Sequence, residues 1–171
     1  MREEMVEIPV EGAGPLPCFL ARADDFPNPS VVVVQEWWGL NDQIRGVARR
    51  LAGERYTAIV PDLYRGAVVE HPDEARKLAM ELDRPRAVAD LRAAVGWLLE
   101  HGVPTIGAMG FCMGGGLVWA LAVDDDRLNA AVPFYGRADL EGKTLRCPVL
   151  AHYGAADRGI PRRRSRTSAI S

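Results

Sequence analysis

The feature that most restricts the fold is the alternation of short β-branched runs with amphipathic stretches. The run SVVVVQE at residues 30–36 is continuously apolar up to its end, which is typical of a strand covered on both faces of a parallel sheet. YTAIVPDLY at 56–64 predicts a second buried strand. Because segments with apolar residues at helical spacing separate such runs, the sequence predicts an α/β fold. Its sheet is expected to be mainly parallel and twisted, with helices on both faces.

The remaining elements follow from periodicity, turns and caps. Asn41 is expected to cap a helix that ends near Gly53, and Pro72 is expected to open another. The predicted strands are 6–10, 16–23, 30–36, 56–64, 105–111, 128–136 and 147–154, and the predicted helices are 41–53, 72–82, 87–102 and 114–123.

Composition narrows the class of protein. A chain of 171 residues with 48% hydrophobic and 26% charged residues is typical of one globular domain, which we place at 1–157. The net charge of −2 argues against nucleic-acid binding, and no secretory signal is visible at the N-terminus, so the cytoplasm is the expected compartment. Three widely spaced cysteines without a CxxC pair favour free thiols over a disulfide framework or a metal site. No cofactor is predicted.

Residues 102–123 carry no charge and are long enough to cross a bilayer. Six glycines and Pro104 interrupt the run, and acidic residues flank it. A buried strand, a tight turn and a buried helix explain the same residues better, so we expect no membrane span.

GFCMGGG at 110–116 holds the strongest chemical signal. Gly110-Phe111-Cys112-Met113-Gly114 has the form G-x-C-x-G, which matches the strand-to-helix elbow that usually carries a nucleophilic serine. The glycines are expected to prevent collisions with the neighbouring strand and helix, and the helix N-terminus to lower the thiol pKa. The alternative is that Cys112 is a small buried hydrophobe on a glycine-rich turn. A phosphate loop is less favoured, since neither GxGxxG nor GxxxxGK[ST] is present.

Other ionisable residues follow the predicted strands. Glu36 is either a partner for the thiol or a solvated charge, and Asp157 is either the acid of a triad or a turn residue. His152 lies within a predicted strand, where a packed or hydrogen-bonded role is favoured. His71 and His101 flank helices, where structural roles are favoured.

Four motifs in order carry a family resemblance: VVVVQE, PDLYRG, GFCMGG and HYGAAD. Together they resemble the dienelactone hydrolase family, carboxymethylenebutenolidase-like proteins with the α/β-hydrolase fold. The resemblance implies a metal-free Cys-His-Asp triad that opens lactone or ester bonds of small molecules. It makes Cys112 the nucleophile, Asp157 the acid that orients a histidine, and Glu36 the carboxylate that holds or accepts the thiol proton.

The resemblance also implies an oxyanion hole and a site for a substrate carboxylate. The backbone amides of Met113 and Trp37 would stabilise the oxyanion. The family binds the substrate carboxylate through arginines, for which Arg76 is the candidate here.

The sequence departs from the family at its C-terminus. The triad histidine should follow Asp157 by a few tens of residues, but no histidine follows His152. Residues 158–171 contain five arginines and no acidic residue, and we expect an out-of-frame or disordered tail there, with a natural basic tail or a nucleic-acid-binding arm as alternatives. The last strand and helix of the fold are expected to be missing.

These departures set the functional expectations. We expect little or no turnover from this chain, a monomer if the fold is complete, and otherwise association through the exposed edge strand 147–154. The alternative function is a non-catalytic binding or scaffold protein on the same fold, with no membrane or nucleic-acid partner.

Overall fold

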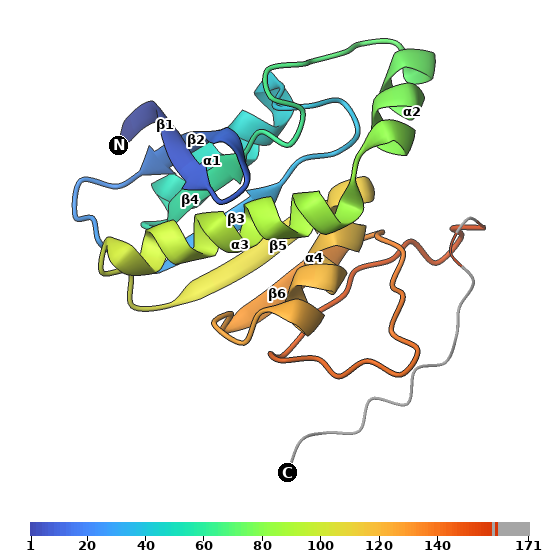
Figure 1. Ribbon diagram of the computed structural model, residues 1–171. Coiled ribbons are helices and arrows are strands. Elements are labelled where there is room, and N and C mark those ends of the chain that lie inside the picture. The colour runs from blue at the N-terminus through green and yellow to red at the C-terminus, as the bar shows by residue number, and fades with distance from the viewer. Residues whose placement is uncertain (159, 161–171) are drawn as a thin grey trace.

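The computed structural model describes residues 1–158 and 160 of the chain. Strands and helices alternate through most of it, and the strands form one sheet in the order β1-β2-β4-β3-β5-β6 (Figure 1). The elements are β1 (Arg2–Val10), β2 (Ala13–Arg22), β3 (Ser30–Val34), α1 (Asp42–Gly53), β4 (Thr57–Pro61), α2 (Pro72–Glu81), α3 (Arg84–Glu100), β5 (Ile106–Phe111), α4 (Met113–Asp124) and β6 (Ala130–Phe134).

The centre of the sheet is parallel, as the buried apolar runs predicted. β3 pairs in parallel with β4 on one side and with β5 on the other, and β5 pairs in parallel with β6. β1 and β2 form an antiparallel hairpin that joins the sheet through β4. The carboxyl ends of β4, β3, β5 and β6 therefore lie at one edge, where ligand sites of open α/β sheets form.

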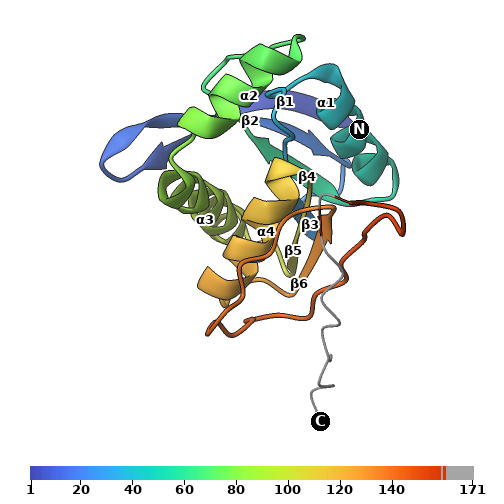
Figure 2. The same ribbon diagram turned by 90° about the vertical axis from the view of Figure 1, so that its right-hand side faces the viewer.

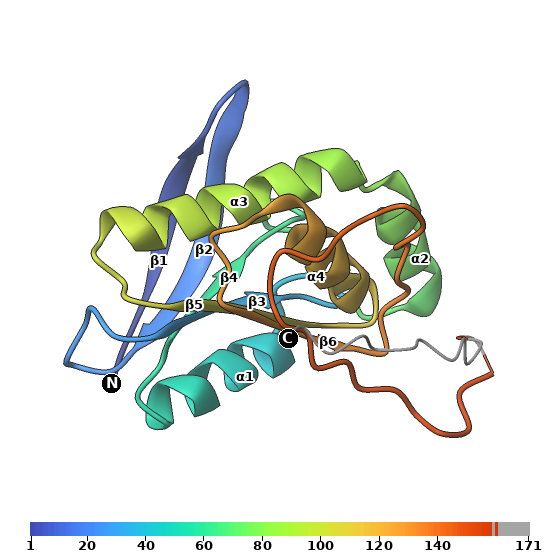
Figure 3. The ribbon, with the colours of Figure 1, turned by 90° about the horizontal axis from the view of Figure 1, so that it is seen from below.

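Helices cover both faces of the sheet. α1 packs on one face, whereas α3 and α4 lie side by side on the other (Figures 2 and 3). Asn41 caps α1 as predicted, with its Oδ1 accepting the N–H of Ile44 at 3.1 Å. The left-handed residue after α1 is Arg55, with φ 67°, rather than Gly53, which remains inside the helix.

The uncharged run at 102–123 folds as a strand, a turn and a helix. β5 ends at Phe111 and α4 begins at Met113, so Cys112 alone separates them. Among the helices of the described chain, none combines the length and the apolar character that crossing a membrane requires.

The predicted last strand, 147–154, is reduced to two isolated parallel bridges beside β6. The N–H of Leu150 donates to the carbonyl of Ala131 at 2.9 Å, and the N–H of His152 donates to that of Pro133 at 3.0 Å. In a regular parallel ladder, residue 133 would donate to the carbonyl of Leu150, but a proline has no N–H. The prediction of a full strand is therefore wrong, although the segment runs where the strand was expected. Residues 159 and 161–171 of the expected tail lie outside the described residues.

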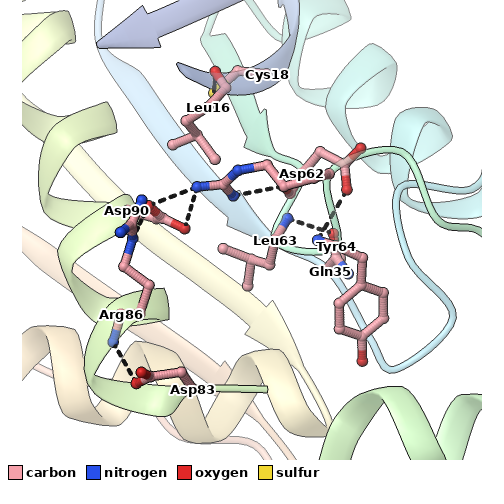
Figure 4. Close-up of polar contacts among 10 residues, drawn as sticks. Leu16, Cys18, Gln35, Asp62, Leu63, Tyr64, Asp83, Arg86 and Asp90 are labelled. Atoms are coloured by element: carbon pink, nitrogen blue, oxygen red, sulfur yellow. Dashed lines mark hydrogen bonds and ion pairs between the residues drawn. The ribbon is translucent and has the colours of Figure 1, made fainter. Parts of the chain in front are cut away.

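Buried polar side chains hold the loop that follows β4 (Figure 4). Asp62 is 4% exposed, and its carboxylate accepts the N–H of Tyr64 at 3.1 Å and that of Gly66 at 2.7 Å. Gln35, fully buried after β3, accepts the N–H of Leu63 at 3.2 Å. Buried side chains thus accept hydrogen bonds from several backbone N–H groups of this loop, and these bonds fix the path of the loop.

Asp90 on α3 ties this loop to the helix layer (Figure 4). Its side chain is 3% exposed and lies 2.9 Å from Nη2 of Arg65 and 3.1 Å from Nε of Arg86. A buried carboxylate is stable only when it is paired, and two guanidinium groups supply that pairing here.

We predict that Asp90→Asn lowers the free energy of unfolding by about 3 kcal/mol, because it leaves two partly buried guanidinium groups without their charge partner. Urea denaturation followed by circular dichroism measures this value. Asp139→Asn is the control, since Asp139 pairs with Lys143 at the surface and its loss should leave the denaturation midpoint in place. Equal midpoints for Asp90→Asn and the unmutated protein would contradict a stabilising role for the pair.

Candidate active site

Four side chains converge at the carboxyl edge of the sheet. Tyr64 follows β4, Glu36 follows β3, Cys112 follows β5 and Tyr135 follows β6, so they come from four neighbouring strands. Cys112 interacts electrostatically with each of the other three. The structure therefore brings together the two residues that the sequence singled out, Cys112 and Glu36, and adds two tyrosines.

Cys112 occupies a strained elbow. Its φ of 54° and ψ of −114° belong to a region that residues other than glycine rarely adopt, and its side chain is exposed. A Cβ atom on Gly110 would lie 2.6 Å from the carbonyl oxygen of Gly114, and a Cβ on Gly114 would lie 2.4 Å from the carbonyl oxygen of Gln35. The expected reason for these two glycines is thus confirmed.

A second close approach fixes α4 against the end of β6. A Cβ on Gly115 would lie 2.5 Å from the carbonyl oxygen of Phe134, and one on Gly136 would lie 2.1 Å from the carbonyl carbon of Gly115. The N–H of Cys112 donates to the carbonyl of Phe134 at 3.1 Å. The sequence analysis assigned no role to Gly136, although its place at the end of a predicted strand was visible.

The pKa of the Cys112 thiol is raised, not lowered as the sequence predicted. Burial is the main cause, and the negative charge of Glu36 adds to it. The neighbouring backbone N–H of Met113 acts in the opposite direction, but it does not outweigh the other two effects. Cys112 is therefore mainly a protonated thiol at neutral pH.

Glu36 is held by Tyr135, a residue that the sequence analysis missed. The hydroxyl of Tyr135 donates to Oε1 of Glu36 at 2.9 Å. Burial, this hydrogen bond and the charges of Glu36 and Cys112 all raise the pKa of Tyr135, so it stays a neutral donor. Its backbone has a φ of 40°, and its position after β6 in the segment PFYG was the available signal.

Tyr64 is the second residue of the site to which the sequence analysis assigned no individual role, although it belongs to the PDLYRG motif. Its hydroxyl lies 3.4 Å from Sδ of Met113, the residue that follows the nucleophile candidate. Burial, together with the charge of Cys112, raises the pKa of Tyr64 to about 12. The phenol is thus neutral and lies over the first turn of α4.

Trp37 lies in the loop after β3. Its ring meets that of Trp38 edge to face, with the ring centroids 5.3 Å apart. The carbonyl of Trp38 accepts the N–H of Val69 at 3.1 Å, and Gly39 packs against the backbone of Ala67 at a distance that leaves no room for a Cβ. The loop that carries Trp37 and Trp38 is therefore held by the segment around Ala67 and Val69. A role of the Trp37 amide in an oxyanion hole stays a prediction.

Asp157 lies in the turn after the segment that runs parallel to β6, at the same edge of the sheet. It is exposed, and its N–H donates to the carbonyl of Gly154 at 3.2 Å. Its role as the acid of a triad stays a prediction. Arg76 lies on the exposed side of α2, and its role in substrate binding likewise stays a prediction.

Two of the three histidines stack on aromatic rings, His71 makes no side-chain cap bond, and structural roles for all three stay predictions. The ring of His152 stacks on Phe134, with centroids 4.6 Å apart and an interplanar angle of 9°. His101 follows α3, where it stacks on Trp97 and its Nδ1 lies 2.7 Å from the Trp97 carbonyl oxygen. His71 precedes α2 at its N-terminal cap position.

Comparison with known proteins gives consistent results. The family model for the dienelactone hydrolase family matches residues 16–169. A curated relative from Yersinia pestis, named "Putative carboxymethylenebutenolidase", is 34% identical over 176 residues, which cover 90% of this chain and 65% of the relative. The chain thus spans slightly less than two thirds of that relative's length.

Solved structures give the same result. A "Putative Dienelactone Hydrolase" from Klebsiella pneumoniae superposes with a TM-score of 0.80 at 32% identity and covers 94% of this chain and 75% of that one. A dienelactone hydrolase-like promiscuous phosphotriesterase from metagenomic libraries gives a TM-score of 0.82 at 27% identity, covering 94% and 71%. The expected α/β-hydrolase fold is confirmed by these neighbours.

We predict that Gly114→Ala destabilises the protein by about 1–3 kcal/mol or more, because its Cβ would strike two backbone carbonyl oxygens that cannot move freely. Gly46→Ala is the matched control: Gly46 lies inside α1 with no atom within 4 Å of its Cβ position, so alanine should stabilise by about 0.5–1 kcal/mol. Chemical denaturation of both variants measures the difference. A Gly114→Ala variant as stable as the unmutated protein would show that α4 can retreat from the sheet.

We predict that Glu36→Gln lowers the pKa of Cys112, since the carboxylate charge disfavours the thiolate. The rate of alkylation of Cys112 by iodoacetamide, measured against pH, should then rise at lower pH in the variant. Glu70→Gln, in the loop before α2, controls for the loss of one negative charge. A midpoint that moves upward or stays in place in Glu36→Gln would show that Glu36 does not act on the thiol.

Proposed function

This chain belongs to the dienelactone hydrolase family, and from that premise we propose that it reacts with small-molecule esters or lactones through Cys112 as the nucleophile. One observation carries the proposal: Cys112 is exposed on an elbow with φ 54°, and the backbone N–H of the next residue, Met113, favours its thiolate. That N–H belongs to the first turn of a helix. It can therefore stabilise negative charge on the sulfur first and on the substrate oxygen once the charge has moved there.

In the first step the thiol must lose its proton. Glu36 is the proposed acceptor, because its carboxylate acts on Cys112 and its orientation is set by Tyr135. The thiolate attacks the carbonyl carbon, a C–S bond forms, and the π electrons move to the oxygen, where the amides of Met113 and Trp37 would stabilise them. Collapse of this intermediate breaks the C–O bond, the alcohol oxygen leaves with the proton that Glu36 took from the thiol, and a thioester remains on Cys112.

In the second step water must attack the thioester, and a base must take the proton of that water. The family pattern gives this task to a histidine oriented by Asp157. The three histidines of this sequence are His71, His101 and His152, and none of them follows Asp157. The rings of His101 and His152 stack on aromatic side chains. We therefore propose that this chain forms the thioester and hydrolyses it slowly at most.

Arg76 is the proposed partner for a substrate carboxylate. It lies on the exposed side of α2, the helix that follows the loop carrying Tyr64. A guanidinium group suits this task because it can bind a carboxylate with two parallel hydrogen bonds.

A binding or scaffold protein is the second candidate, and the segment beside β6 favours it. Leu150 in that segment is 63% exposed, and backbone bonds on one side alone join the segment to the sheet in the described part of the chain. Such an edge can accept another strand. This candidate predicts no selective chemistry at Cys112.

We predict that p-nitrophenyl acetate acylates Cys112 once and that release of p-nitrophenolate then nearly stops. Intact-mass and peptide mass spectrometry should find one acetyl group per chain on Cys112 and none on Cys18 or Cys147, which are buried. Cys112→Ala should abolish the burst. Equal labelling of all three cysteines would favour the scaffold, and steady release near the typical enzyme rate of about 10 s⁻¹ would contradict the slow second step.

A further inference from the structure

The segment that carries Tyr153 holds the turn after β6 through three hydrogen bonds. The N–H of Tyr135 donates to the carbonyl of His152 at 2.8 Å, and the N–H of His152 donates to that of Pro133 at 3.0 Å. The hydroxyl of Tyr153 donates to the carbonyl of Gly136 at 2.8 Å. These bonds therefore reach the chain on both sides of Tyr135.

The hydroxyl of Tyr153 also receives a hydrogen bond. Nε1 of Trp119, on α4, donates to it at 2.9 Å. Because the hydroxyl accepts one bond and donates another, its orientation is set and it joins α4 to the turn after β6. α4 begins directly after Cys112, so this one hydroxyl links the helix of the proposed nucleophile to the turn that carries Tyr135.

Tyr135 needs such support, because its backbone lies in the left-handed region. Its φ is 40°, a value that residues other than glycine keep only where the surrounding structure enforces it. The carbonyl that Tyr153 binds belongs to the next residue, Gly136, which packs on Gly115 without room for a Cβ. The close packing sets the position of the turn, and the Tyr153 bond sets the direction of the peptide group that leaves it.

The direction of the Tyr135 side chain matters because its hydroxyl holds Glu36. The hydroxyl donates to Oε1 of Glu36 at 2.9 Å, and Glu36 is partly exposed. A carboxylate is better solvated in water, so without this bond Glu36 would turn outward, away from the thiol. The charge of Glu36 raises the pKa of Cys112, and the pKa of the thiol therefore reports on where the carboxylate lies.

We propose that Tyr153 is a positioning residue for the reaction at Cys112. Its hydroxyl, held by Trp119, fixes the turn after β6 so that the hydroxyl of Tyr135 keeps the Glu36 carboxylate beside the thiol. The inference rests on the proposed function, in which Glu36 is the proton acceptor. It deepens that function by giving a role to a residue of the C-terminal segment that acts only through other residues.

The test measures the rate of alkylation of Cys112 by iodoacetamide against pH, with peptide mass spectrometry to assign the label, and takes the midpoint of the profile. Tyr153→Phe removes the hydroxyl and keeps the ring. Trp119→Phe is a second variant, which removes the donor that orients this hydroxyl. Tyr56→Phe is the matched control, because Tyr56 and Tyr153 are both 41% exposed and the Tyr56 hydroxyl has no hydrogen bond within the described part of the chain.

Tyr153→Phe should lower the midpoint by about 0.3 pH unit or more, which raises the alkylation rate below the midpoint by about twofold or more. Without the hydroxyl the carboxylate of Glu36 spends less time beside the thiol, so the thiolate is less disfavoured. Trp119→Phe should move the midpoint in the same direction by a smaller amount, and Tyr56→Phe should leave it in place. An unchanged or raised midpoint in Tyr153→Phe would overturn the proposal.

A double variant separates positioning from a merely structural role. If Tyr153 acts through the charge of Glu36, Tyr153→Phe combined with Glu36→Gln should have the same midpoint as Glu36→Gln alone, because the charge that is positioned is gone. If Tyr153→Phe lowers the midpoint by the same amount in both backgrounds, Tyr153 acts on the thiol by another route and the proposal is wrong. Circular dichroism confirms that each variant is folded.

Failure of this inference and failure of the proposed function give different results. Alkylation needs only a reactive thiol, whereas the proposed function needs acylation of Cys112 by p-nitrophenyl acetate. If the midpoints shift as expected but the ester does not acylate Cys112, the link from Tyr153 to Glu36 stands and the proposed function is wrong. If the ester acylates Cys112 but the midpoint is the same in Tyr153→Phe and the unmutated protein, the proposed function stands and Tyr153 is not a positioning residue.

Discussion

The candidate site depends on how closely the first turn of α4 approaches the sheet. Gly114 lies against the end of β3, where a Cβ would come within 2.4 Å of the carbonyl oxygen of Gln35. Gly115 and Gly136 meet at the end of β6, where a Cβ on Gly136 would come within 2.1 Å of the carbonyl carbon of Gly115. With the helix this close, one residue must turn the chain from β5 into α4, and Cys112 does so with a φ of 54°. The strain is retained because packing on both sides determines it.

The same close approach sets the electrostatics of the thiol. It places Cys112, which remains exposed, between Glu36 and two neutral tyrosines, where partial loss of solvent and the Glu36 charge disfavour the negative form of the sulfur. The Met113 amide favours it, but less strongly. The proposed nucleophile is therefore held as a thiol with its proposed proton acceptor nearby, rather than as a permanent thiolate. Such a thiol is less susceptible to oxidation, because the thiolate is the form that reacts with oxidants.

The sheet divides the surroundings of Cys112 into two unlike sides. On the β6 side lie an exposed segment with Leu150 at its surface and the turn that carries Asp157. On the β4 side a loop is fixed by Asp62 and by the pairing of Asp90 with two arginines. This loop has a fixed path, and an open groove lies between it and the turn from α2 into α3.

The sequence by itself determined the order and type of most elements, the cap at Asn41, the elbow at Cys112 and the need for glycine at residues 110 and 114. These features depend on local periodicity or on contacts between segments that adjoin along the chain. The tertiary structure alone decided the direction of the Cys112 pKa shift and the roles of Tyr64 and Tyr135, because those depend on which strand ends become neighbours. That order, β4-β3-β5-β6, differs from the order along the chain. It also decided the fate of the last predicted strand, since the missing N–H of Pro133 matters only once residues 147–154 lie beside β6.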